Sequence, residues 1–306
     1  MSVQIEFRHP ALADKPWIDE CYRRSACRGS ECSFVNLYLW GRGYGQVARV
    51  GDYLVQFIKY GDVKYYAFPA GEGDLRAVID ALIADAASYC HPMRLLGVTA
   101  ERRAALEALY PGQFRFTENP DSFDYLYEVD RLADLGGKKL QSKRNHCHRF
   151  EENYPDWAVE PITPASLDRC RGMVRKWFAQ YDGETSEAHD FRVEKIALDR
   201  AFEDYEALGL EGLMLLAEGR VAAFTMGNRI QPDTFDVNFE KAFHEIQGAY
   251  PVINREFARC VREKYPDVRY LNREDDMGLP GLRRAKESYH PDILLRKAEA
   301  VLEASL

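Results

Sequence analysis

The chain lacks three features that would assign it to common classes: long apolar segments, a secretory leader and paired cysteines. Its longer apolar runs, such as YLVQFIKY and LEGLMLLA, are far shorter than the roughly 20 residues that a bilayer-spanning helix needs. The N-terminal stretch MSVQIEFRHPALADKP lacks the charged start, apolar middle and small-residue cleavage site of a signal peptide. The sequence therefore predicts a cytoplasmic protein without a transmembrane segment.

Cysteine usage excludes a disulfide framework. The seven cysteines are an odd number, they are scattered, and no C-x-x-C occurs. The tightest group, Cys21, Cys27 and Cys32, lacks the short paired spacing of structural zinc sites. The pattern predicts reduced, mostly buried thiols and no metal site.

Negative charge exceeds positive charge overall, but one short segment is strongly basic. The formal net charge is -8, which argues against general nucleic-acid binding because phosphate contacts need clustered Lys and Arg. Between residues 138 and 149, however, the chain carries Lys138, Lys139, Lys143, Arg144 and Arg149. This basic segment is a candidate anion site, in which Lys139, Lys143 and Arg144 would hold the phosphates of a donor. The alternative is a solvated helix face.

The two halves of the 306 residues share an order of elements although their residues barely match. Each half predicts a strand, a helix, a tight hairpin, a strand, a helix, a strand, a helix and a closing strand. The opening strands are IEFRHP (residues 5–10) and WAVEPIT, and the helices after the hairpins and their third strands cover residues 74–89 and about 249–264. The hairpins turn at Gly51-Asp52 and Glu218-Gly219, and the closing strands are DYLYEV and DILLR. This order predicts an α/β protein with mixed sheets flanked by helices, as in the GCN5-related N-acetyltransferase fold. We expect an N-terminal domain at 1–135 and, at 136–306, the basic bridging helix with a C-terminal domain; the alternative is two unrelated α/β domains.

Two long motifs carry a family resemblance over nearly the whole chain. DYLYEVDRLADLGGKKLQSKRNHCHRF is similar to a strand followed by a G-K-K-x-x-x-K-R-N helix, and LNREDDMGLPGLRRAKESYHP is similar to an N-x-E-x-D-x-G-x-x-G-L-R-x-A-K-x-S-Y-x-P segment. Both occur in bacterial proteins related to the C-terminal domain of phosphatidylglycerol lysyltransferase. The resemblance implies two acetyltransferase-like domains in tandem, with the better-preserved site in the second. Relatives fused to membrane spans move an aminoacyl group from aminoacyl-tRNA to a lipid, but this chain carries no such spans.

The same resemblance implies two catalytic residues. In this fold class, an Asn on the strand corresponding to VRYLN often orients the donor's amide, and a Tyr on the following helix often protonates the leaving group. Asn272 and Tyr289 occur in the matching order. Glu240, at the end of TFDVNFE, is the predicted general base by position, and Asp276 is the second choice. An ordinary surface carboxylate is the alternative for Glu240, because a base near neutrality needs partial burial.

Two further places suit an anion. The loop HEIQGAYP precedes a helix beginning near Ala249, whose N-terminal amides could face a phosphate, with Gly248 allowing close approach. Departures from the acetyltransferase loop pattern at Glu245 and Tyr250 argue against coenzyme A, and a purely structural glycine is the alternative. Arg283 and Lys286 lie three residues apart on a predicted helix and could clamp a phosphate or carboxylate; a solvated charged face is the alternative.

These residues support an acyl- or aminoacyltransferase that moves its group directly from a phosphate-bearing donor to an amine or hydroxyl. The donor would be aminoacyl-tRNA or, in a second interpretation, acyl-CoA; no cofactor is expected apart from coenzyme A or acyl-CoA in that second case, where it is the donor. The acceptor would be a small molecule, peptide or lipid. A non-enzymatic alternative is a degenerate tandem acetyltransferase that only binds a ligand or partner, which the irregular loop around Gly248 favours.

Overall fold

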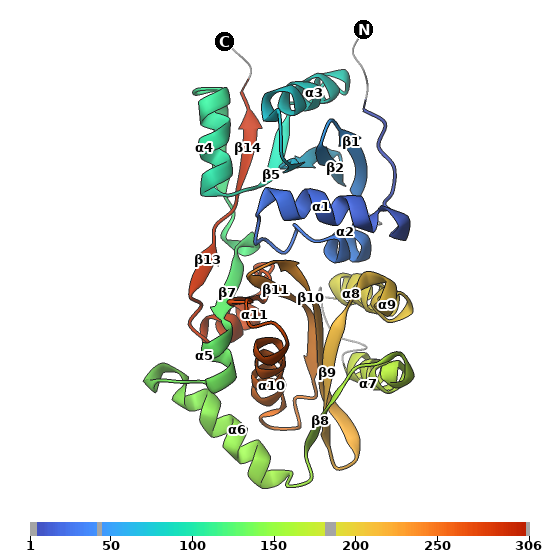
Figure 1. Cartoon of the computed structure of the whole chain (residues 1–306), viewed down its shortest axis with the longest axis vertical. Helices are drawn as coiled ribbons and strands as arrows, with labels where there is room; N and C mark the ends of the chain where they lie inside the picture. The colour runs from blue at the N-terminus through green and yellow to red at the C-terminus, as the bar shows by residue number, and fades with distance from the viewer. Residues whose placement is uncertain (1–4, 42–44, 181–187, 304–306) are drawn as a thin grey trace. The chain divides into compact units, whose positions relative to one another are not determined.

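In a computed structural model, the chain folds around two seven-stranded sheets, each built from parallel and antiparallel pairs (Figure 1). The structure describes residues 5–41, 45–180 and 188–303. The chain divides into two compact units, and neither is a single stretch of sequence. Unit 1 comprises residues 1–124, 275–283 and 294–306, and unit 2 comprises residues 125–274 and 284–293. The predicted α/β class, with mixed sheets flanked by helices, is confirmed.

Unit 1 contains the first sheet, whose strands follow the order β1-β2-β3-β5-β14-β6, with β4 paired to β2. Its strands are β1 (Gly45–Val50), β2 (Tyr53–Tyr60), β3 (Val63–Ala67), β4 (Ala70–Gly71), β5 (Arg94–Val98), β6 (Phe114–Glu118) and β14 (Ala298–Leu302). Its helices are α1 (Lys15–Ser25), α2 (Phe34–Trp40), α3 (Leu75–Ser88) and α4 (Ala100–Leu109), with short 3-10 turns at Leu12–Asp14 and Pro120–Ser122.

The core of unit 1 follows from the amphipathic pattern of its elements. Helix α3 starts at Asp74, whose side chain accepts from the Ala77 amide at 3.0 Å, and it buries Ile79 and Leu82 completely. These side chains pack with Leu95 of β5 and with Ala300 of β14. The last strand of the chain therefore contributes to the same core as α3.

Unit 2 is built on the second sheet, in the order β13-β7-β12-β11-β10-β9-β8. Its strands are β7 (Asp124–Glu128), β8 (Ala158–Pro161), β9 (Glu211–Ala217), β10 (Arg220–Gln231), β11 (Thr234–Ala242), β12 (Tyr270–Asn272) and β13 (Ile293–Leu295). Its helices are α5 (Val129–Asp134), α6 (Gln141–Asn153), α7 (Leu167–Ala179), α8 (Ala188–Glu203), α9 (Tyr205–Leu208) and α10 (Ala249–Lys264), with 3-10 turns at Lys138–Leu140 and Pro164–Ser166. Helix α10 lies on one face of strands β9 to β11 and α7 on the other (Figure 1).

Both predicted hairpins are present. Val50 pairs with Tyr53 across the first turn, and Ala217 pairs with Arg220 across the second. Glu218 and Gly219 both have positive φ, at 52° and 71°, which is the backbone of the tight turns that match the twist of two strands. The strand predicted over residues 5–10 is wrong, because only an isolated bridge joins Arg8 to Val47 there.

Both strands that close the predicted halves lie in one sheet, that of unit 2. DYLYEV forms β7, which lies beside β12, and DILLR forms β13, which pairs with β7 at the edge of the sheet. The chain then adds β14, which the sequence did not predict and which inserts between β5 and β6 of unit 1. Helix α11 (Pro280–Glu287) begins in unit 1 and ends in unit 2. The domain boundary after residue 135, and the origin of the halves as repeats, stay predictions. Within the described parts of the chain, no helix is both long and apolar enough to cross a membrane.

Candidate functional site

Three polar side chains from separate elements of unit 2 meet around Arg273. Glu240 comes from β11, Arg273 follows β12 directly, Lys143 lies on α6, and Tyr289 follows α11. The Arg273 guanidinium lies 5.0 Å from the ring centre of Tyr289, and the Lys143 Nζ lies 4.1 Å from the same centre. The cations Arg273 and Lys143, the phenol of Tyr289 and the carboxylate of Glu240 together form the candidate site.

Glu240 fixes the orientation of Arg273. Arg273 Nη2 donates to Glu240 Oε1 at 2.9 Å, and Asn254 Nδ2 reaches Glu240 Oε2 at 3.4 Å. The side chains of Arg273 and Glu240 are only 14% and 9% exposed. Arg273 Nη1 is buried and has no hydrogen-bond partner in the described part of the chain. A buried guanidinium N–H without an acceptor is costly, so this nitrogen is a donor available to an anionic or carbonyl ligand.

Tyr289 is held in an environment that keeps its hydroxyl protonated. The side chain is 5% exposed and contacts the ring of Tyr127 edge to face at 6.3 Å. Burial raises the pKa of Tyr289 well above its ordinary value, although the Arg273 charge opposes this rise. A protonated phenol beside two cations suits a hydrogen-bond donor or a general acid.

Lys143 is the one residue of the predicted basic site that turns toward this cluster. Burial lowers the pKa of its ammonium group, and the neighbouring Arg273 charge lowers it further. The contact with the Tyr289 ring offsets part of this cost, because a cation over an aromatic face is attracted by the ring. Keeping two cations together in a partly buried place is the arrangement expected of an anion site.

The other predicted cations of the basic segment take different roles. Lys139 is exposed at the surface of unit 2. Arg144 donates to the carbonyls of Leu135 and Gly137, where α5 ends, and to the Gln141 side chain. Arg144 therefore stabilises the turn before α6, and this use of its donors argues against a phosphate there.

Asn272 and Lys286 support the backbone that carries Arg273. Asn272 is fully buried, and its Oδ1 accepts from the Glu274 amide at 2.7 Å. Lys286 Nζ donates to the carbonyls of Arg273 at 2.5 Å and Glu274 at 3.1 Å. The Lys286 ammonium group therefore stabilises the loop at Arg273 and Glu274. To clamp a phosphate together with Arg283, as predicted, Lys286 would have to give up these two hydrogen bonds.

Asp276 and Arg283 belong to unit 1 and form a closed ion pair. The fully buried carboxylate of Asp276 accepts from Arg283 Nε and Nη2, both at 2.8 Å, and from the Gly278 amide at 2.9 Å. Arg283 also contacts Asp121 at 2.7 Å. These bonds fix the MGLPG loop and leave Asp276 poorly suited to accept a proton in catalysis.

The glycine before α10 has a structural explanation. Gly248 caps the helix with a φ of 91°, and a Cβ built on it would lie 2.5 Å from the His146 carbonyl oxygen and 2.8 Å from Phe150 Cβ. Helix α6 therefore occupies the space into which a phosphate was predicted to fit. The Ala249 amide donates to the Ile246 carbonyl at 3.1 Å. This geometry counts against the predicted donor-binding roles of Gly248 and Ala249.

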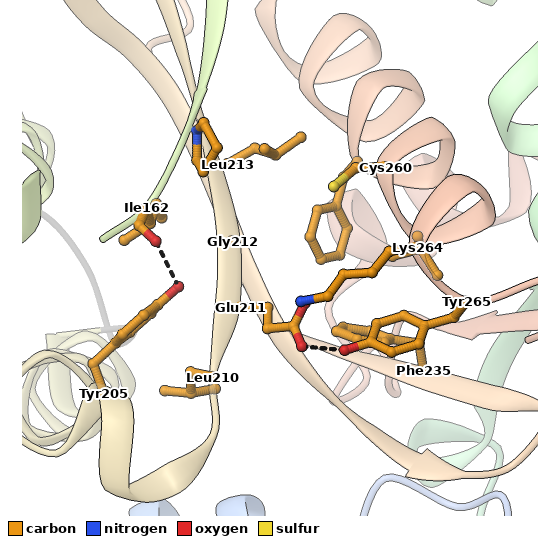
Figure 2. A pocket seen from close by; sticks show the side chains of 13 residues that line it. Ile162, Tyr205, Leu210, Glu211, Gly212, Leu213, Phe235, Cys260, Lys264 and Tyr265 are labelled. Atoms are coloured by element: carbon orange, nitrogen blue, oxygen red, sulfur yellow. Dashed lines mark hydrogen bonds and ion pairs between the residues drawn. The ribbon is translucent and has the colours of Figure 1, made fainter. Parts of the chain in front are cut away.

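Apart from the site around Arg273, unit 2 contains a cavity of about 250 Å³ with mostly apolar walls that include Ile162, Leu213 and Phe235 (Figure 2). At its edge, Glu211 accepts from Lys264 at 2.7 Å and from the Tyr265 hydroxyl. Figure 2 also shows the Tyr205 hydroxyl directed at the Ile162 carbonyl, 3.4 Å away. These polar groups are hydrogen-bonded to one another, so the cavity presents an apolar surface to a ligand and no acid–base pair.

Sequence reasoning missed Arg273, which joins Glu240, Tyr289 and Lys143 into one site. The residue is the second letter of NREDD, and its position directly after a buried strand was the available signal. The two residues before Arg273, Leu271 and Asn272, are fully buried. Its role as the centre of the cluster needed the tertiary structure.

Two mixed sheets flanked by helices define the fold class of the chain, and comparison with known proteins assigns its family. The sequence profile described as "Phosphatidylglycerol lysyltransferase, C-terminal" matches residues 22–297. The chain belongs to this family, as the resemblance of its two motifs implied.

Solved structures agree with the family. A conserved protein of unknown function from Bacteroides thetaiotaomicron is 41% identical, with a TM-score of 0.90 over 98% of this chain and 100% of that one. L-PGS from Bacillus licheniformis (16% identical, TM-score 0.63, 90% and 88% covered) and FemX (10%, 0.58, 96% and 97%) share the fold. An uncharacterised protein from Mycoplasmoides gallisepticum is 25% identical over 182 residues, 58% of this chain and 55% of that protein, so the match spans about half of this curated relative.

Proposed function

We propose that this protein transfers an aminoacyl group from aminoacyl-tRNA to an amine or hydroxyl acceptor, at the cluster around Arg273. The observation that carries the proposal is the buried Arg273 Nη1, a charged donor without an acceptor in the described structure, lying with Lys143 beside the protonated Tyr289. Family membership supports the reaction class, since the family takes its name from a lysyltransferase.

The choice of aminoacyl-tRNA over acyl-CoA rests on the start of α10. Acyl-CoA would need its phosphates at the backbone amides of this loop. The carbonyl of His146 lies where they would approach Gly248, and the Ala249 amide is already bonded. Lys143 and Arg273 offer the alternative anion site. They suit the phosphate of a tRNA end or the ester carbonyl of its aminoacyl group.

The chemistry needs no covalent enzyme intermediate. The acceptor nitrogen or oxygen attacks the ester carbonyl, and Arg273 and Lys143 stabilise the oxyanion that develops. The bond between the acyl carbon and the ribose oxygen then breaks, and Tyr289 gives its proton to the leaving oxygen. The acceptor releases its own proton to solvent, and Tyr289 takes one back from solvent. Glu240, predicted as the base, is bonded through both oxygens, so we assign it the positioning of Arg273. Asn272, Lys286 and the Asp276–Arg283 pair are assigned to holding loops.

The acceptor class stays open between small amines, peptides and lipids. The apolar cavity lined by Ile162, Leu213 and Phe235 gives no reason to choose a lipid headgroup, because its polar groups are paired with one another. The test must therefore offer more than one acceptor.

The decisive assay follows radiolabelled amino acids from charged tRNA into acid-stable or lipid-soluble product. It offers phosphatidylglycerol vesicles, a peptide mixture and free amines as acceptors, with acetyl-CoA as the competing donor. Tyr289→Phe should lower turnover by about 100-fold or more, the scale of general acid catalysis, and leave tRNA affinity nearly unchanged. Lys143→Ala should weaken tRNA binding and reduce its salt dependence by roughly one phosphate contact.

Lys176→Ala provides the control, because Lys176 is an exposed cation of unit 2 on α7. It should match wild type in both assays. The proposal is wrong if acetyl-CoA alone serves as donor. It is also wrong if Lys143→Ala and Lys176→Ala weaken tRNA binding equally, because the basic segment then acts only as diffuse surface charge.

A further inference from the structure

The loop between α1 and α2 of unit 1 brings two thiols and a carboxylate to one point. One sulfur or oxygen atom from each of Cys27, Glu31 and Cys32 lies within 4.8 Å of the other two. The cysteines are 7% and 3% exposed. Two soft thiolate ligands with one carboxylate make a set that zinc accepts, and the spread of the atoms is within reach of metal–ligand bonds of about 2.0–2.3 Å.

Each of the three groups receives an outer hydrogen bond. The Gly29 amide donates to Cys27 Sγ at 3.4 Å, and Arg102 Nη2 donates to Cys32 Sγ at 3.3 Å. Lys297 Nζ donates to Glu31 Oε2 at 2.7 Å. Sulfur is a weak acceptor as a thiol and a stronger one as a thiolate, so N–H donors on both sulfurs favour the form that binds metal.

Glu31 keeps one oxygen for a ligand. Its Oε1 is buried and accepts no hydrogen bond in the described part of unit 1, while Arg102 Nη1 lies 3.7 Å away. Two glycines make room for this carboxylate. A Cβ on Gly29 would lie 2.5 Å from Glu31 Oε2, and one on Gly97, where φ is 70°, would lie 2.9 Å from Oε1. A side chain at either glycine would have to displace the Glu31 carboxylate from its present position.

The local charges accommodate a divalent cation. Lys297 also pairs with the buried Asp124 at 2.7 Å, so two cations, Arg102 and Lys297, face two carboxylates, Asp124 and Glu31. With both thiols protonated, these four charges cancel. A divalent ion that displaces two thiol protons leaves the sum unchanged, so binding creates no uncompensated buried charge.

The cluster borders a cavity of about 510 Å³ within unit 1. Glu31, Cys32, Arg102 and Lys297 line it, together with aromatic side chains that include Tyr65. A cation held by three protein ligands would keep its fourth position open toward this cavity, as in zinc sites that hold a water or a substrate.

We propose that Cys27, Glu31 and Cys32 bind Zn²⁺, with the fourth coordination position facing the cavity of unit 1. This site is independent of the transferase reaction assigned to unit 2. The spacing of the cysteines gave no reason to predict it, because the outer donors from Arg102 and Lys297 join this loop only in the fold.

The test uses the full chain, reduced with a phosphine, freed of metal and titrated with Zn²⁺ against a chromophoric chelator. Wild type should bind one equivalent and release close to two protons, measured by titration in weakly buffered solution. Cys27→Ser, Cys32→Ser and Glu31→Gln should each weaken binding at least 10-fold. Cys21→Ser is the matched control and should bind as wild type, because Cys21 is a buried thiol of α1 outside the cluster.

A measurement on wild type alone covers the case in which a variant fails to fold. Zn²⁺ should protect Cys27 and Cys32 from alkylation, located by mass spectrometry, and leave the labelling of the exposed Cys90 unchanged. Absence of stoichiometric Zn²⁺ binding overturns the proposal, and so does equal affinity in Cys21→Ser and Cys32→Ser. Recovery of a Cys27–Cys32 disulfide that Zn²⁺ does not prevent would also overturn it.

Discussion

Replacing Gly248 by alanine should destabilise unit 2 through two separable effects. Alanine at a φ of 91° enters the left-handed region, at about 1–2 kcal/mol. Its Cβ would lie 2.5 Å from the His146 carbonyl oxygen and 2.8 Å from Phe150 Cβ, so α6 and α10 must move apart, which adds about 1–3 kcal/mol as for other overpacked sites. The free energy of unfolding should therefore fall by about 2–5 kcal/mol.

Urea denaturation followed by circular dichroism measures this loss, and amide hydrogen exchange locates it. Exchange should accelerate in α6 and α10 by roughly 30-fold or more, since about 1.4 kcal/mol corresponds to a factor of ten. Gly209→Ala is the control, because Gly209 has a φ of 70° at the end of α9 and a Cβ there would meet no described atom within 4 Å. If the two variants lose equal stability, the close approach of α6 is not what requires glycine, and a phosphate at Gly248 becomes tenable again.

Two further predictions concern buried ionisable groups. Asp276→Asn should lower the free energy of unfolding by about 1–3 kcal/mol, because it weakens the charge-assisted bonds from Arg283; a change in urea midpoint worth less than about 0.5 kcal/mol would contradict this. Burial raises the pKa of Cys147 to about 11, so its thiol should resist iodoacetamide at pH 8 while the exposed Cys90 reacts. Because the thiol ionises near pH 9 in the unfolded chain, the free energy of unfolding should fall as the pH rises from about 9 to about 11. Labelling of folded protein followed by mass spectrometry tests the second prediction, and equal rates at both cysteines would refute it.

Local sequence signals predicted most single elements. The helices 74–89 and 249–264 appear as α3 and α10, and the two hairpin turns lie where Gly51 and Gly219 indicated. The sheet partners of β7 could not be read in this way, because an ordinary strand pattern does not specify a sheet, and β14 was not predicted at all. Short α2, between the cysteine loop and β1, was also missed, since seven residues carry little periodic signal.

The candidate site shows the same division between local and tertiary information. Glu240, Tyr289 and Lys143 were each chosen from the sequence, and the structure places all three against Arg273. The sequence could not show that both Glu240 oxygens are bonded or that α6 covers Gly248. Both facts depend on residues far apart in the chain, so charge and spacing alone overestimated the number of residues free to bind a donor.

The position of β14 has a consequence for biosynthesis. A ribosome delivers the chain from its N-terminus, so β5 and β6 leave the exit tunnel nearly 200 residues before the strand that hydrogen-bonds to both. Until residues 298–302 emerge, both of these strands present unpaired backbone groups, which are templates for wrong pairing with other chains. Because this five-residue strand arrives late, the nascent chain depends on rapid completion or on chaperone protection. Unit 1, most of which is synthesised first, therefore completes its sheet last.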